Sequence, residues 1–233
     1  MHHPLYQKAT YLKSVPTLDL CPEELTHEIA FAGRSNAGKS SALNVITSQK
    51  TLARTSKTPG RTQLINFFPV DETRSLVDLP GYGFAKVNVK IKRAWEAGLT
   101  KYIEEREALK GLVLLMDSRM EPTDIDLIML DWTLSIDLPV HVLLTKSDKL
   151  KKGPAKAGLL RLQQLIDEHY PHATVQLFSS LNKQGLDEVW DKLDSWMEFE
   201  YSKLESPVHQ RHQAEKGTKL KKKKKKGNIR HFN

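Results

Sequence analysis

Six short apolar runs recur between residues 29 and 178, and their spacing predicts the strands of a single sheet. They span residues 29–32, 64–68, 76–77, 112–116, 140–144 and 175–178. Several of these runs are almost continuously hydrophobic, which is typical of strands that are covered on both faces. Helical patterns alternate with them. The chain is therefore expected to form an α/β fold, with helices on both faces of a mostly parallel six-stranded sheet.

Apolar residues at the i, i+3, i+4, i+7 spacing predict the helices. The clearest pattern spans residues 186–197, where Trp190 and Trp196 are interpreted as core side chains. A similar pattern spans residues 159–166 and follows Pro154, which suits a first helical turn. Two further helices are expected, one over residues 41–46 and one between residues 85 and 110, the latter with Trp95, Leu99, Tyr102 and Ile103 on one face.

The two ends of the chain fall outside this alternation. Residues 1–27 contain scattered prolines and are expected to form an N-terminal extension or an extra strand against the domain. From residue 206 onward stand ten of the 36 basic residues and one of the 28 acidic residues, so the formal net charge of +8 belongs to the tail. Because Lys221–Lys226 repel one another and no apolar periodicity accompanies them, residues 204–233 are expected to be disordered, which leaves a domain over residues 28–203.

Composition limits the class of protein further. Cys21 is the single cysteine of the sequence, so no disulfide can form within the chain, as is usual in a reducing cytosol. Nothing around Cys21 suggests an activated thiol, and we expect an ordinary buried or surface side chain. No stretch approaches the roughly 18 apolar residues of a membrane span, and the N-terminus has no apolar signal core. We therefore expect a cytoplasmic, monomeric protein without stable membrane insertion.

Residues 33–40 read Gly-Arg-Ser-Asn-Ala-Gly-Lys-Ser, which is the G-x-x-x-x-G-K-S pattern of a phosphate-binding loop. The pattern stands between the first predicted strand and the first predicted helix, where its mechanism requires it. Glycines let successive N–H groups point at phosphate oxygens, and the helix N-terminus adds partial positive charge. Lys39 is expected to reach the β- and γ-phosphates, and the Ser40 hydroxyl to coordinate Mg²⁺. The alternative is a chance match in a Gly/Ser turn, which the position disfavours.

Two loops after the phosphate-binding loop could respond to a γ-phosphate. In Asp78-Leu79-Pro80-Gly81, Asp78 would hold Mg²⁺ through its water shell and the Gly81 N–H would sense the phosphate. In residues 58–63, a threonine hydroxyl could reach Mg²⁺ only when a γ-phosphate draws the loop in, and we choose Thr62 over Thr58. The alternatives are an ordinary Asp-x-Pro-Gly turn and an ordinary mobile loop.

The purine base has its own candidates after the last two predicted strands. In Thr145-Lys146-Ser147-Asp148, the Asp148 carboxylate can accept two hydrogen bonds from guanine N1–H and N2–H₂, a pair of donors that adenine lacks. Lys146 would lie across the base plane. Residues 178–180, Phe-Ser-Ser, would offer a backbone N–H to guanine O6, which is a weak signal by itself. The structural alternative for residues 145–148 is a polar turn after a strand.

Together these motifs resemble those of the EngB (YihA/YsxC) family of ribosome-assembly GTPases, within the TrmE–Era–EngA–EngB–septin-like P-loop GTPases. The matching segments are GRSNAGKS (33–40), TPGRTQ (58–63), DLPGYGFAKV (78–87), TKSD (145–148) and FSS (178–180). The resemblance implies a single Ras-like GTPase domain that hydrolyses GTP slowly with Mg²⁺. It also implies a switch role in late assembly of the large ribosomal subunit, and a need for the protein in normal cell division and septation.

The resulting set of predicted site residues falls into three groups. The catalytic candidates are Lys39, Thr62 and Gly81, and the direct Mg²⁺ ligands are Ser40 and Thr62. The nucleotide-binding candidates are Gly33, Arg34, Ser35, Asn36, Ala37, Gly38, Lys39, Ser40, Gly60, Arg61, Thr62, Gln63, Leu64, Asp78, Leu79, Pro80, Gly81, Thr145, Lys146, Ser147, Asp148, Phe178, Ser179 and Ser180.

Three residues of these motifs bear on mechanism. Tyr82 occupies the slot of the water-orienting glutamine of Ras-type GTPases, and since it has no amide to position water, intrinsic turnover is expected to be slow. Thr145 replaces the more usual asparagine, and its hydroxyl can still join the loops with fewer bonds. By resemblance, Asn36 would ligate K⁺ and make turnover K⁺-stimulated. An asparagine that merely shapes the loop is the equal alternative.

The basic residues leave the choice of partner open. Lys221–Lys226 would neutralise several phosphates of ribosomal RNA, which we favour over a solvated tail and over an anionic membrane surface. Lys86, Lys90, Lys92 and Arg93 could add contacts that depend on the nucleotide state, or form a solvated helix face. Two other functions stay open: a nucleotide-gated protein of the division site with incidental GTPase activity, and an ATPase of similar fold.

Overall fold

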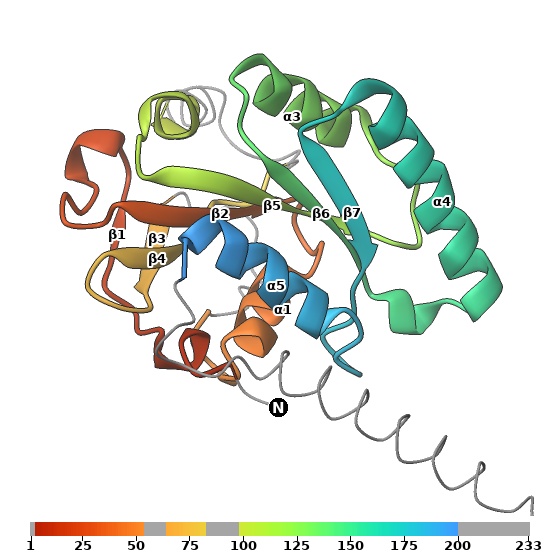
Figure 1. The fold of residues 1–233 in the computed structure, drawn as a ribbon, viewed down its shortest axis with the longest axis horizontal. Coiled ribbons are helices and arrows are strands. Elements are labelled where there is room, and N and C mark those ends of the chain that lie inside the picture. Colours follow the sequence, from red (N-terminus) through yellow and green to blue (C-terminus); the bar gives the residue numbers. More distant parts are fainter. Residues whose placement is uncertain (1–2, 54–63, 83–97, 200–233) are drawn as a thin grey trace, which may run out of the picture. The chain divides into compact units, whose positions relative to one another are not determined.

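A seven-stranded sheet with the order β1-β3-β4-β2-β5-β6-β7 forms the centre of the fold (Figure 1). The computed structural model describes residues 3–53, 64–82 and 98–199. The strands are β1 (Lys13–Val15), β2 (His27–Gly33), β3 (Ile65–Pro69), β4 (Arg74–Asp78), β5 (Leu109–Asp117), β6 (Val140–Thr145) and β7 (Ala173–Leu177). The helices are α1 (Lys39–Ile46), α3 (Asp124–Ser135), α4 (Lys152–His169) and α5 (Leu186–Met197), with short 3₁₀ turns η1 (Tyr6–Lys8), η2 (Leu18–Leu20) and η3 (Ser147–Lys149).

All six predicted strands are present, and the sheet gains β1 at one edge. The strands β4, β2, β5, β6 and β7 run parallel, β3 pairs antiparallel with β4, and β1 pairs antiparallel with β3. β1 comes from the N-terminal extension, where Lys13 pairs with Phe67 and Val15 with Ile65. Three residues are too few for a detectable alternation, so the apolar runs predicted six strands. The extra strand expected as one alternative for residues 1–27 is confirmed as β1. Because the parallel strands point the same way, the loops after them meet at one edge of the sheet.

The predicted helices over residues 41–46, 159–166 and 186–197 correspond to α1, α4 and α5. Of the helix expected between residues 85 and 110, residues 98–105 are helical and bury Leu99, Tyr102 and Ile103, whereas Trp95 lies outside the described residues. The helix α3 was not predicted. Apolar residues occur on nearly all of its sides, and Ile125 and Ile128 are exposed, so no single apolar face stands out.

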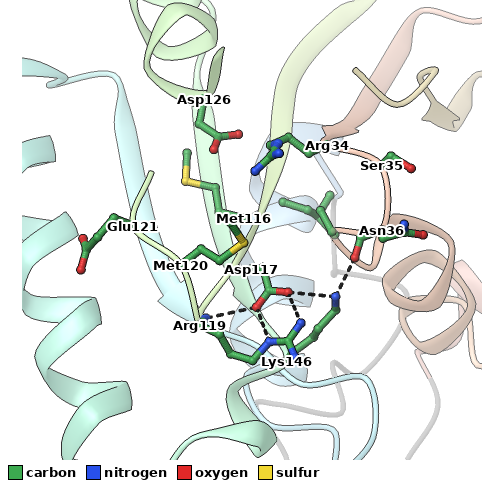
Figure 2. A pocket seen from close by; sticks show the side chains of 12 residues that line it. Arg34, Ser35, Asn36, Met116, Asp117, Arg119, Met120, Glu121, Asp126 and Lys146 are labelled. Atoms are coloured by element: carbon green, nitrogen blue, oxygen red, sulfur yellow. Dashed lines mark hydrogen bonds and ion pairs between the residues drawn. The ribbon is translucent and has the colours of Figure 1, made fainter. Parts of the chain in front are cut away.

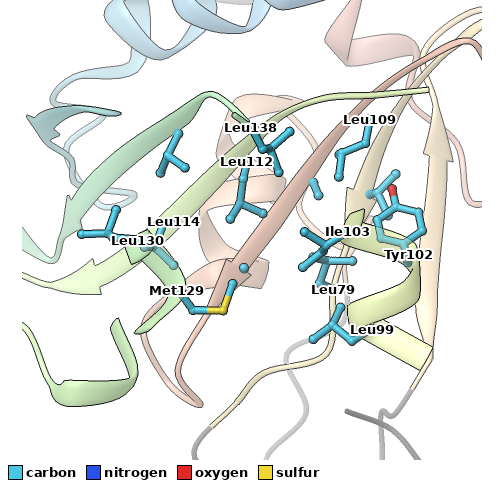
Figure 3. Packing of buried hydrophobic residues seen from close by; sticks show 14 of the residues in the cluster. Leu79, Leu99, Tyr102, Ile103, Leu109, Leu112, Leu114, Met129, Leu130 and Leu138 are labelled. Carbon is cyan, nitrogen blue, oxygen red and sulfur yellow. The ribbon is translucent and has the colours of Figure 1, made fainter. Parts of the chain in front are cut away.

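Side chains from β5, α3 and the helix at residues 98–105 pack together on one face of the sheet (Figure 3). Leu112 and Leu114 of β5 are fully buried there beside Met129 and Leu130 of α3. On the other side of the sheet α5 contacts β2, β5 and α1, and Trp190 is fully buried with its indole N–H donating to the Ile46 carbonyl at 3.0 Å. The two apolar layers explain why the central strands are nearly continuous hydrophobic runs.

The N-terminal segment packs on the last helix. The carboxylate of Asp194 in α5 accepts a hydrogen bond from the Tyr6 hydroxyl at 2.8 Å, and its other oxygen lies 3.1 Å from His3 Nε2. Tyr6 is fully buried and His3 is 2% exposed. Residues far apart in the sequence therefore complete the same part of the core.

A buried carboxylate, Glu28, joins β2 to the segments that contain Tyr102, Arg106 and Pro22. Glu28 at the start of β2 is fully buried, accepts a 2.7 Å bond from the Tyr102 hydroxyl and forms an ion pair with Arg106, whose guanidinium also bonds the Pro22 carbonyl. Cys21 is buried near this group, and burial raises the pKa of its thiol to about 11, as suits an unreactive side chain.

A buried histidine joins β6 to β7. His141 Nδ1 lies 2.7 Å from Thr174 Oγ1, and His141 Nε2 lies 2.8 Å from Gln176 Oε1. The amide N–H of Gln176 donates to the Gly185 carbonyl at 2.7 Å, which leaves Oε1 to accept from His141 Nε2–H. Burial lowers the pKa of His141 from 6.5 to about 4, so the ring is neutral at pH 7.

The chain divides into two units after Met197, and the predicted disordered tail lies outside the described residues. In the part of the chain that the structure describes, no helix has both the length and the apolar character needed to cross a membrane.

Candidate nucleotide-binding site

The loop between β2 and α1 has the backbone shape that a phosphate cradle requires. Gly38 directly precedes α1 with a φ of 100°, and Asn36 has a φ of 65°, so two residues of this short loop adopt left-handed conformations. The N-cap residue Gly38 offers no side chain to cap α1, and an N-terminus of this kind carries partial positive charge that attracts an anion.

The first glycine of this loop is required by packing. A Cβ at Gly33 would lie 2.8 Å from the Leu115 carbonyl oxygen of β5, so a larger residue would push the two strands apart. Two backbone bonds join the same loop to the residues that follow β4. The Tyr82 N–H donates to the Gly33 carbonyl at 3.3 Å, and the Ser35 N–H donates to the Tyr82 carbonyl at 3.1 Å.

The predicted phosphate lysine and the predicted magnesium carboxylate are direct partners. Lys39 Nζ and Asp78 Oδ1 form an ion pair, and both side chains are largely buried, 13% and 11% exposed. The strands β2 and β4 are neighbours in the sheet, which brings the ends of both strands together. A phosphate could replace Asp78 as the partner of Lys39, and a metal ion could replace Lys39 as the partner of Asp78.

The loop after β6 is bonded directly to the phosphate-binding loop. The Thr145 hydroxyl is 2.6 Å from the Ala37 carbonyl and 3.0 Å from the Met116 carbonyl, so the hydroxyl joins the loops as predicted. Lys146 Nζ donates to the Asn36 carbonyl at 2.6 Å. The residues predicted to contact base and phosphates therefore form one connected structure.

The predicted base-reading carboxylate is oriented by the loop after β7. Asp148 Oδ1 accepts a 2.6 Å hydrogen bond from the Ser179 hydroxyl, and the side chain is 12% exposed. This bond, followed by the contact with Lys149, lowers the pKa of Asp148, which keeps the carboxylate ionised. The Ser147 N–H donates to the Phe178 carbonyl at 3.2 Å, which joins the two base loops.

The Tyr82 hydroxyl has its hydrogen-bond partner in α3. The residue is 6% exposed, and its hydroxyl donates to Asp126 Oδ1 of α3 at 2.9 Å. Burial raises the pKa of the Tyr82 hydroxyl strongly, and the neighbouring Asp126 charge adds to the effect. Asp126 Oδ2 accepts from the Thr123 N–H and hydroxyl in a capping box. Tyr82 therefore joins the end of β4 to the start of α3.

Some predicted site residues lie outside the described residues. They are Gly60, Arg61, Thr62 and Gln63, together with Thr58 and the basic residues Lys86, Lys90, Lys92 and Arg93. Leu64 is described and directly precedes β3, whose first residues lie at the same sheet edge because Asn66 pairs with Asp78. The other predicted positions follow β2, β4, β6 and β7 at that edge.

Asp117, the last residue of β5, and Arg119, which follows this strand, were not predicted from the sequence, and they lie between the two loops (Figure 2). Asp117 Oδ2 lies 2.9 Å from Lys146 Nζ and 2.6 Å from Arg119 Nη2. A cavity of about 240 Å³ lies beside this cluster, with Arg34 and Glu121 among its lining residues. No short motif marks Asp117. The strand order could have indicated it, since β5 lies between β2 and β6.

Comparison with known proteins identifies the family. The model of a family described as "50S ribosome-binding GTPase" matches residues 28–146. A protein of Hydrogenovibrio crunogenus named "probable GTP-binding protein EngB" is 74% identical over 200 residues, which cover 86% of this chain and 94% of that protein. The chain belongs to the EngB family of GTP-binding proteins.

Solved structures agree with the EngB fold. A crystal structure of a probable GTP-binding protein engB has a TM-score of 0.60 at 21% identity, covering 73% of this chain and 98% of that one. The structure of Era with MgGDPNP and nucleotides 1506–1542 of 16S ribosomal RNA has a TM-score of 0.56 at 21% identity, covering 73% of this chain and 56% of that one. At these identities the likeness shows the P-loop GTPase fold.

Proposed function

We propose that this EngB-family protein binds GTP and GDP with Mg²⁺, hydrolyses GTP slowly, and acts as a switch in late assembly of the large ribosomal subunit. The observation that carries the nucleotide site is the convergence of four loops. The loops after β2, β4, β6 and β7 meet at one sheet edge and are joined by the bonds of Ser35, Thr145 and Ser147 to their neighbours. Ligands of open α/β sheets bind at this edge.

The phosphate side of the proposed site would be formed by the loop at residues 33–40. Lys39 would exchange Asp78 for the β- and γ-phosphates, while the N–H groups of the first turn of α1 bind phosphate oxygens. The Ser40 hydroxyl and the Asp78 carboxylate are hard oxygen donors that suit Mg²⁺, Asp78 acting through the water shell of the ion. The Thr62 hydroxyl would be a further direct ligand of Mg²⁺. When bound, the ion neutralises phosphate charge. Gly81 would donate its N–H to the γ-phosphate.

The base side would select guanine through Asp148. The Ser179 hydroxyl already holds one oxygen of this carboxylate at 2.6 Å, which orients the group before a base arrives. Lys146 would cover the base plane, and a backbone N–H of residues 178–180 would meet guanine O6. A purine without the N1–H and N2–H₂ donors would leave a buried carboxylate with unmet acceptors, which penalises adenine.

Slow turnover follows from the position of Tyr82 in this proposal. Its hydroxyl is bonded to Asp126, so it supplies no group to orient an attacking water. By family resemblance, we propose that K⁺ held by Asn36 compensates in part. Turnover in KCl should exceed turnover in NaCl at equal ionic strength, and equal rates would remove the K⁺ proposal.

The ribosomal role rests on the comparisons and on charge. The matching family model is described as ribosome-binding, and the Era structure contains ribosomal RNA. Lys221–Lys226 would contact RNA phosphates, and Lys86, Lys90, Lys92 and Arg93 would make that contact depend on nucleotide. We propose a GTPase domain over residues 28–203, with the extension 1–27 before it and the tail 204–233 after it. A protein that assembles the large subunit would be located in the cytoplasm. The need for the protein in septation would follow from this assembly role.

Calorimetry tests the nucleotide site. GDP and GTP should each release binding heat with Mg²⁺ present, and ATP should not. Lys39→Ala should abolish this heat, whereas Lys156→Ala, an exposed lysine of α4, should preserve it. Ser40→Ala should mainly lose the dependence on Mg²⁺. Absence of heat for guanine nucleotides with the unmodified protein would contradict the proposal.

Sedimentation tests the partner. The protein should move with the large subunit when a non-hydrolysable GTP analogue is present, less so with GDP, and the association should weaken as salt rises. A chain ending at residue 203 should show a smaller dependence on salt. Movement with membranes and not with ribosomes would contradict the ribosomal role and favour a function at the division site.

A further inference from the structure

Asp117 has no place in the proposed function so far, yet it lies between both halves of the site. It is the last residue of β5, the strand between β2 and β6. Its side chain is 11% exposed and contacts two cations (Figure 2). Arg119 donates to Oδ1 through Nε at 2.9 Å and to Oδ2 through Nη2 at 2.6 Å, while Lys146 Nζ lies 2.9 Å from Oδ2.

We propose that Asp117 is a positioning residue for the bound nucleotide: with Arg119 it holds the Lys146 ammonium against the Asn36 carbonyl, and it thereby prolongs the lifetime of the GDP and GTP complexes alike. The proposal rests on the proposed function of the same site. Asp117 itself would contact no nucleotide atom and acts through Lys146.

The backbone at the two joined positions needs such a restraint. Asn36 has a φ of 65° and Lys146 a φ of 58°, so both are non-glycine residues in the left-handed region. Such conformations cost roughly 1 kcal/mol or more and persist where surrounding contacts enforce them. Here the enforcing contact is the 2.6 Å bond from Lys146 Nζ to the Asn36 carbonyl, which joins one strained residue to the other.

The charge of Asp117 fixes the position of that ammonium. The bonds from Arg119, and after them the bond from Lys146, hold the pKa of Asp117 well below its usual range, so the carboxylate stays ionised at every working pH. The planar Arg119 fork occupies both carboxylate oxygens and so fixes the carboxylate plane. Oδ2 then faces Lys146 in one orientation. An uncharged side chain at this position would remove the ion pair between Asp117 and the Lys146 ammonium.

The effect should be the same for the two nucleotides. Asn36 belongs to the loop that would cradle the phosphates, and Lys146 to the loop that would cover the base, and GDP and GTP share both of these contacts. Losing a charged partner of a hydrogen-bonded group commonly weakens an interaction by about tenfold. A residue that senses only the γ-phosphate, as proposed for Gly81, would instead alter the GTP complex alone.

The test compares two carboxylates that line the same cavity. Asp117→Asn removes the charge that holds Lys146. Glu121→Gln removes an equal charge from a side chain that is 72% exposed and pairs with Arg161 at 2.7 Å. Dissociation of fluorescent GDP and of a fluorescent non-hydrolysable GTP analogue is measured by displacement. We expect about tenfold faster release of both from the Asp117 variant and unchanged release from the Glu121 variant.

Thermal unfolding of the nucleotide-free proteins separates positioning from a general structural role. If the Asp117 variant melts early but releases nucleotide at the normal rate, the proposal is wrong. Acceleration of GTP release alone would also contradict it. Failure of the unmodified protein to bind either nucleotide would instead refute the proposed function, so the two failures are distinguishable.

Two more variants keep the test informative. If Asp117→Asn does not fold, Arg119→Ala removes the fork from a side chain that is 48% exposed and should accelerate release by about threefold, with Arg119→Lys restoring part of the lifetime. In a Lys146→Met background, Asp117→Asn should have no further effect on release, because its partner is gone. A full effect in that background would show that Asp117 acts through another group and would overturn the proposal.

Discussion

Acidification should destabilise this fold through one buried side chain, His141. The ring is 5% exposed and lies between β6 and β7, hydrogen-bonded to Thr174 and Gln176. Burial lowers its pKa from 6.5 to about 4, because a charged imidazolium would lose its hydration there. Protonation of His141 therefore favours the unfolded chain.

The size of this effect follows from the two pKa values. The unfolded chain binds a proton at His141 near pH 6.5, while the folded chain does so only near pH 4. The stabilising contribution is complete above pH 6.5 and is lost as the pH falls through 4. At pH 5 nearly all unfolded chains but only about a tenth of folded chains carry this proton, which corresponds to a loss of about 2 kcal/mol relative to pH 8.

Urea unfolding of the nucleotide-free protein at pH 8 and pH 5 measures this loss. His172 also has a lowered pKa through burial, so the comparison is made with His141→Phe, in which His172 still titrates. The unmodified protein should lose about 2 kcal/mol more than the variant between the two pH values. Equal losses in both proteins would refute the reasoning, whatever the absolute stability of the variant at pH 8.

Three other substitutions have defined outcomes. Asp148→Asn should weaken GTP binding selectively and relax base choice toward xanthine, as measured by competition among GTP, XTP and ATP. Gly111→Ala should cost about 1–3 kcal/mol of unfolding free energy in urea, because its Cβ would lie 2.5 Å from Trp196 Cε3. Thr145→Val should cost about 1 kcal/mol in the nucleotide-free protein, since the Ala37 carbonyl loses its donor at 2.6 Å; an unchanged urea midpoint would contradict this.

The strands could be predicted because burial on both faces leaves a direct trace in the sequence. β5 and β6 are almost entirely buried, and their apolar runs are long enough to be detected without any periodicity. β1 could not be found in this way, since it has three residues and its position depends on pairing with β3. The helix α3 was missed because Ile128 is 58% exposed. Its capping box, Thr123 with Asp126, was the local signal available.

In the site, too, residues marked by a local motif could be predicted, whereas residues placed by the strand order could not. Loops at residues 33–40 and 145–148 were found because each motif follows a predicted strand, and parallel strands carry such loops to one edge. Asp117 depends on the position of β5 between β2 and β6, which strand order determines and a single motif does not. The direction of the Tyr82 side chain depends on Asp126 in α3, an element that the pattern did not predict.

The attachment of the N-terminal segment to α5 has a consequence for biosynthesis. His3 and Asp194 are separated by 191 positions, so a translating ribosome exposes the segment long before its partner helix is made. Tyr6 is fully buried in the finished protein. Until α5 leaves the exit tunnel, the Tyr6 hydroxyl has no Asp194 carboxylate to accept its hydrogen bond. Nascent chains arrested before α5 should therefore present an unfinished apolar surface, which is a target for chaperones and proteases.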